Sequence, residues 1–80
     1  MYMEYFEFID DKSSKFWKIE KVGDTKIITK WGRISGKSRE TELSYDTIQL
    51  RDLDYSKKRE DKIKKRYIKK LLTSNNENIK

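Results

Sequence analysis

The side chains best suited to chemistry in this sequence are a tryptophan and an arginine separated by one glycine, Trp31-Gly32-Arg33. Residues two apart on a strand project from the same face, so Trp31 and Arg33 would lie side by side. An indole can stack on a base and a guanidinium can bind phosphate, while Gly32 would let another backbone approach closely. Nearby cations could add phosphate contacts, namely Lys30, Lys37 and Arg39. The alternatives are that Trp31 belongs to a core and that Arg33 is an ordinary surface cation.

Catalysis is disfavoured by composition. The sequence contains no cysteine, which excludes a thiolate nucleophile and a cysteine zinc site, and no histidine, the commonest general base and metal ligand. The segment from Gly32 to Ser38 approximates a phosphate-binding loop, but its spacing is one residue short and no helix follows directly. We therefore expect no enzyme activity, no metal site and no cofactor.

The net charge of +6 is unevenly distributed along the chain. Residues 1–54 hold 10 basic and 11 acidic side chains, whereas residues 55–80 hold 10 basic and 3 acidic ones. A one-sided positive field attracts polyanions such as nucleic acid. The alternative is a lysine-rich helix face that only contacts solvent.

Four strands are predicted in the first part of the chain, at 3–9, 15–22, 25–34 and 39–45. Turn residues separate them, with a hairpin expected at Gly23-Asp24. Alternation places Trp17 and Ile19 on one face of their strand and Lys18 and Glu20 on the other, so we expect Trp17 in the core.

A helix of about 20 residues is predicted after Thr47, whose hydroxyl could cap it, although residues 48–50 also fit a short strand. The pattern, strongest over 57–71, has an apolar stripe of Tyr55, Ile63, Tyr67 and Leu71. Four lysines are predicted on roughly the opposite side of this helix: Lys58, Lys62, Lys65 and Lys69. They are candidates for auxiliary phosphate contacts, and the alternative is that they only contact solvent. The predicted fold class is α+β, with one helix packed on a sheet of about four antiparallel strands. The domain is expected at 1–72, followed by a frayed polar tail at 73–80.

No apolar run approaches the ~18 residues of a membrane span, and the N-terminus is not typical of a signal peptide. We therefore expect an intracellular protein, cytoplasmic or nuclear, with no membrane partner.

These features together resemble the WGR domain family. The resemblance rests on Phe16-Trp17, the turn at Gly23, the Trp31-Gly32-Arg33 tripeptide with Ile34, and Tyr45 followed by Thr47, and it extends through Asp61-Lys62 to Tyr67. It covers about residues 3–70. The sequence departs from the family pattern at Ile34-Ser35-Gly36-Lys37, and at Arg66, where the family has glycine.

The resemblance implies a nucleic-acid-binding module. It implies that Trp31 packs against a sugar at a strand terminus and that Arg33 contacts phosphate or a neighbouring domain. We expect a preference for ends, nicks or junctions, with DNA favoured over RNA. The alternative is a protein–protein adaptor that uses the same surface, and the oligomeric state is left open.

Overall fold

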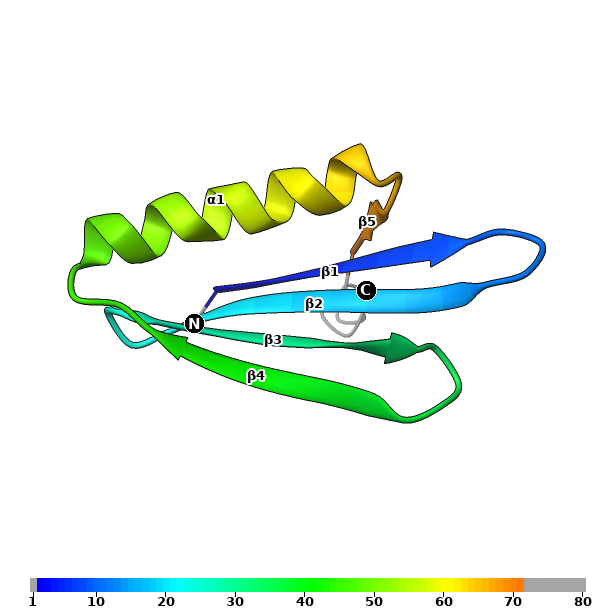
Figure 1. Ribbon diagram of the computed structural model, residues 1–80, viewed down its shortest axis with the longest axis horizontal. Coiled ribbons are helices and arrows are strands. Elements are labelled where there is room, and N and C mark those ends of the chain that lie inside the picture. Colours follow the sequence, from blue (N-terminus) through cyan, green and yellow to red (C-terminus); the bar gives the residue numbers. More distant parts are fainter. Residues whose placement is uncertain (1, 72–80) are drawn as a thin grey trace, which may run out of the picture.

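The computed structural model describes residues 2–71, which form one antiparallel sheet with a helix along one side (Figure 1). The strands are β1 (Tyr2–Ile9), β2 (Ser14–Val22), β3 (Lys26–Arg33), β4 (Ser38–Ser44) and β5 (Ile68–Lys70), and the helix is α1 (Ile48–Lys64). The sheet order is β4-β3-β2-β1-β5. The predicted α+β class is confirmed, and β5 is a fifth strand in addition to the four expected. The predicted tail, 73–80, lies outside the described residues.

The core lies between α1 and one face of the sheet. Its buried hydrophobic residues are Phe6, Trp17, Ile19, Ile27 and Tyr55. Trp17 and Ile19 are two residues apart on β2 and therefore point to the same face. The cross-strand register places Phe6 of β1 and Ile27 of β3 on that face as well. Trp17 is only 5% exposed, so the prediction that it belongs to the core is confirmed.

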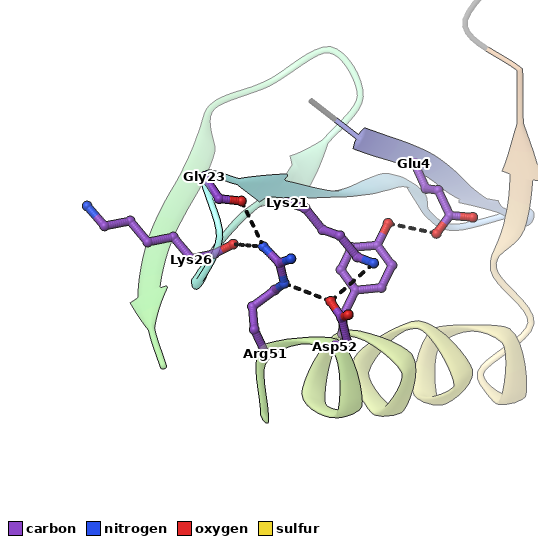
Figure 2. A network of polar contacts seen from close by, with 7 residues as sticks. Glu4, Lys21, Gly23, Lys26, Arg51 and Asp52 are labelled. Carbon is purple, nitrogen blue, oxygen red and sulfur yellow. Dashed lines mark hydrogen bonds and ion pairs between the residues drawn. The ribbon is translucent and has the colours of Figure 1, made fainter. Parts of the chain in front are cut away.

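The start of α1 is fixed to the turn between β2 and β3. The hydroxyl of Thr47 accepts a hydrogen bond from the Leu50 amide at 3.1 Å, which confirms the predicted cap. Arg51 is buried and donates through Nη1 to the carbonyls of Gly23 and Lys26, at 3.2 and 3.4 Å (Figure 2). Its Nε donates to Asp52 at 2.8 Å. Residues 48–50 form the first turn of the helix and not a short strand. The cap at Thr47 and the contacts of Arg51 hold this first turn against the β2–β3 turn.

The predicted C-terminal end of the helix is wrong. The helix ends at Lys64, and Arg66 adopts a left-handed conformation with φ of 72°. The Arg66 amide donates to the carbonyl of Ile63 and the Tyr67 amide to that of Lys62, both at 3.0 Å, which is the Schellman arrangement. The chain then reverses, and residues 68–70 pair with β1 instead of continuing the helix.

The predicted apolar stripe of the helix is therefore also wrong. Tyr55 and Tyr67 pack on the core, but Ile63 is 46% exposed and Leu71 is 82% exposed. The buried positions on α1 are Arg51 and Tyr55, four residues apart. Lys62, seven residues after Tyr55, lies over the rings of Trp17 and Tyr67. The prediction that four lysines form an outer row on the helix is also wrong. Lys62 faces the sheet, and Lys69 belongs to β5 and not to the helix.

A buried carboxylate links β1, α1 and β5. Glu4 is 3% exposed and accepts hydrogen bonds from the Tyr55 hydroxyl at 2.8 Å and from Arg59 Nε at 3.0 Å. The ammonium of Lys69 lies 2.8 Å from its Oε2. Figure 2 shows Glu4 extending from the sheet toward the helix. Burial alone would raise the pKa of Glu4, but the hydrogen bonds from Lys69, Tyr55 and Arg59 together hold it below the ordinary value of 4.5.

We predict that Glu4→Gln destabilises the fold by about 2 kcal/mol at pH 7. Removing one member of a buried ion pair costs about 3–5 kcal/mol. The cost is smaller here, because Arg59 and Lys69 are partly exposed and water can solvate their charges after Glu4 is replaced. Since the pKa of Glu4 is lowered on folding, this contribution is present above pH 4.5 and is lost as the pH falls through the folded value. Urea unfolding of both proteins between pH 3 and 7 measures it. An energy difference independent of pH would contradict this role of Glu4.

We also predict that Arg66→Gly stabilises the fold by about 1 kcal/mol, because a left-handed residue with a Cβ costs about that much. Thermal unfolding should show an increase in Tm of about 4–8 °C. Lys65→Gly is the matched control, since the φ of Lys65 is −85° and glycine there only adds flexibility. An unchanged or lowered Tm for Arg66→Gly would contradict the prediction.

Candidate nucleic-acid interface

Trp31 and Arg33 project from the face of the sheet that carries α1. Trp31 lies opposite the core residue Trp17 in the register of β2 and β3, and Arg33 is two residues further along β3. Trp31 is 36% exposed, whereas Trp17 is 5% exposed. On its other side Trp31 pairs with Arg39 of β4, so Arg39 projects from the same face. One partly exposed indole is thus accompanied by two exposed guanidinium groups.

Gly32 is required at the centre of the tripeptide by a close approach of its own chain. A Cβ at this position would collide with the carbonyl oxygen of Lys37 and come within 2.9 Å of Ser38 Cα. The backbone that packs closely against Gly32 is therefore the start of β4 in the same chain. This approach allows Arg39 to lie beside Trp31.

A groove separates Trp31 from the helix. Its volume is about 280 Å³, and its walls come from the sheet and from α1. The lining residues are Trp17, Thr29, Trp31, Lys58, Asp61 and Lys62. An aromatic ring on one wall and two ammonium groups on the other are suited to a sugar or base that carries a phosphate.

Lys62 is the cation most closely integrated into this groove. Its ammonium lies 5.5 Å from the ring centre of Trp17 and 5.2 Å from that of Tyr67. Burial lowers the pKa of Lys62, and the charges of Lys65, Lys15 and Lys58 lower it further, although the Asp61 carboxylate opposes this shift. An anion in the groove would offset this accumulated positive charge.

The groove lies toward the most basic end of the molecule, because Trp31 is near the end of β3 and Lys58, Asp61 and Lys62 are in the second half of α1. The antiparallel topology brings the β1–β2 loop, the β3–β4 loop and the C-terminal end of α1 to one end (Figure 1). Segments 10–15, 33–39 and 61–66 hold nine basic and three acidic side chains there, a net charge of +6. The rest of the sequence holds eleven of each, so this end has the whole excess charge. Such a field draws polyanions to the groove.

The sequence profile of the WGR domain matches residues 2–74, which is nearly the whole chain. The chain belongs to the WGR domain family. WGR domains are generally nucleic-acid-binding modules and are not catalytic domains. Comparison with curated proteins gives no match.

The WGR fold of this chain is similar to a crystal structure of a protein from Bacteroides fragilis. The TM-score is 0.81 at 27% sequence identity over 88% of this chain. The match spans 20% of the Bacteroides protein, so the chain covers about a fifth of that protein's length.

Not all predicted contact residues of this WGR domain lie together. Lys30 points to the opposite face of the sheet from Trp31, and Lys37 lies in the β3–β4 loop. Lys58 and Lys62 line the groove, and Lys58 also pairs with Asp54 at 3.6 Å. Lys65 pairs with Asp61 at 3.2 Å and Lys69 pairs with Glu4, so these two cations are already partnered.

One basic residue was missed by sequence reasoning. Lys15 lies directly opposite Arg33 in the register of β2 and β3, and it is exposed on the same face. Neither Lys15 nor Arg33 forms an ion pair with another residue in 2–71. Like charges directly across a sheet repel each other, so this pair is suited to a shared anion. The predicted hairpin at Gly23-Asp24 could have revealed Lys15, because the position of the turn determines that Lys15 pairs with Arg33 across the two strands.

Within residues 2–71, no helix is long and apolar enough to span a membrane, and no acidic cluster has the arrangement of a metal site.

Proposed function

We propose that this WGR domain binds nucleic acid at ends, nicks or junctions of DNA through the groove beside Trp31. The observation that carries the proposal is the partly exposed indole, with cations around it on neighbouring strands and on the helix. A ring with an open face can stack only on a sugar or base that is not already stacked. Such groups occur where a duplex terminates or is interrupted.

The surrounding cations have separate roles in the proposal. Arg33 and Lys15 together bind one phosphate, since they face each other across β3 and β2 without a carboxylate partner. Arg39, Lys58 and Lys62 contact the adjoining backbone from either side of Trp31. Phosphate contacts of this kind position the strand and do not read its sequence, so the domain would be indifferent to base identity.

The protein–protein adaptor remains the second candidate. It is favoured by the match to only a fifth of a longer protein, in which neighbouring parts of the chain could contact this surface. In that case DNA binding would be weak, purely electrostatic and independent of Trp31.

We predict that Trp31→Ala weakens binding to a blunt hairpin DNA about tenfold or more, because stacking on one base contributes about 1–3 kcal/mol. Trp31→Phe should retain most of the affinity, since it preserves an aromatic face. The measurement is fluorescence anisotropy on a blunt hairpin, a nicked duplex and a dumbbell with both ends closed, over a salt series.

Two charge variants serve as a matched pair in the same assay. Arg33→Gln should weaken binding and reduce the salt dependence, whereas Lys26→Gln should have little effect because Lys26 lies at the other end of β3 and pairs with Glu42. Equal binding to all three DNAs, unchanged in Trp31→Ala, would contradict the proposal and favour the adaptor.

A further inference from the structure

The face of the sheet that points away from α1 carries an aromatic pair that no described element covers. Tyr5 of β1 and Phe16 of β2 stack with ring centres 5.8 Å apart and planes inclined by 19°. Both rings are only half-buried. The Tyr5 hydroxyl donates to Glu7 at 2.9 Å, and this bond together with burial raises the pKa of Tyr5 to about 12. The pair is therefore a neutral and orientated aromatic surface at physiological pH.

Two lysines lie next to this aromatic pair without a partner. Lys18 of β2 is directly opposite Lys30 of β3, and Tyr5 is the other cross-strand neighbour of Lys18. Like charges in this position destabilise a sheet. Neither lysine forms an ion pair with any residue in 2–71.

The carboxylates on the same face relieve this repulsion only in part. Glu40 lies across from Lys30, and Glu20 is two residues from Lys18, yet neither engages these lysines in an ion pair. Glu7 is occupied by Tyr5, and Glu42 pairs with Lys26 at 3.1 Å. The two ammonium groups are consequently available to an external anion.

The aromatic pair and the two lysines border one depression. It has a volume of about 320 Å³ and is lined by Met3, Tyr5, Phe16, Lys18, Lys30 and Ile34. Phe16 lies opposite Gly32, which has no side chain to cover the ring. Aromatic and aliphatic groups thus meet two lysines that form no ion pair, on an open surface.

We propose that this face is a second binding site, specific for single-stranded nucleic acid. Unstacked bases would lie on Tyr5 and Phe16 while Lys18 and Lys30 contact consecutive phosphates. The interior of a duplex is excluded from the aromatic surface, because its bases are stacked on each other and paired. Trp31 follows Lys30 in β3 and points to the other face, so the two sites are back to back across the sheet.

The test uses fluorescence anisotropy with a single-stranded oligothymidylate of twelve nucleotides and, separately, the blunt hairpin. Phe16→Leu is expected to weaken oligothymidylate binding about tenfold and to leave hairpin binding unchanged. The double variant Lys18→Gln, Lys30→Gln should reduce the slope of log affinity against log salt by about 1.4, which corresponds to two phosphates. Lys26→Gln, on the same face but paired with Glu42, is the matched control.

Trp31→Ala separates this proposal from the function proposed for the groove. It should leave oligothymidylate binding unchanged while hairpin binding falls. Loss of oligothymidylate binding in Trp31→Ala, with no effect of the open-face variants, would overturn the second site and assign single strands to the groove. Absence of any oligothymidylate binding would also overturn it, and the face would then be a candidate for protein contacts.

Photo-crosslinking of the unaltered protein to an oligothymidylate that contains 4-thiothymidine avoids any effect of substitutions on folding. Crosslinks are expected on Tyr5 or Phe16 themselves and not on Trp17, which lines the groove on the other face. Crosslinks confined to the peptide that contains Trp31 would contradict the proposal.

Discussion

The arrangement of this domain depends on one buried carboxylate. Glu4 accepts a hydrogen bond from Tyr55 and pairs with Arg59, both on α1, and it also pairs with Lys69 on β5. A helix whose sheet-facing residues are mostly polar has little apolar area with which to pack, so these polar contacts must hold it in place. These contacts are in the middle of the helix, and Arg51 fixes its start through the carbonyls of Gly23 and Lys26. Because the helix is held at its start and its middle, the groove beside Trp31 has a defined width.

The antiparallel topology of the sheet also determines where the basic side chains gather. Antiparallel pairing gathers two loops and the end of the helix at one end of the molecule, and that end has all the excess positive charge. The acidic residues of α1 near its start compensate the cations at the other end, as in the contact of Asp52 with Lys21 and Arg51. A small domain can in this way attract a polyanion to one end while most of its surface remains neutral.

The sequence predicted the sheet well and the helix only in part. Alternation identified Trp17 as a core residue and placed Trp31 and Arg33 on one face, because a period of two is independent of the rest of the fold. The helix period misassigned Ile63 and Leu71, since Arg66 ends the helix in a conformation that arginine seldom adopts. Lys15 and Glu4 could not be found locally, because the partners that define their roles are distant in the sequence. The profile match over residues 2–74 shows that the resemblance seen in Phe16-Trp17 and Trp31-Gly32-Arg33 identified the family correctly.

The measurement that tests the central claim most directly is two-dimensional NMR of the ¹⁵N-labelled protein titrated with a blunt hairpin DNA. The two tryptophans give two indole N–H signals, one from the core residue Trp17 and one from Trp31. Binding in the groove predicts a large shift of the Trp31 indole and of the Arg33 and Lys15 amides, with smaller changes at the far end of the sheet. An unshifted Trp31 indole at saturating DNA would contradict the account.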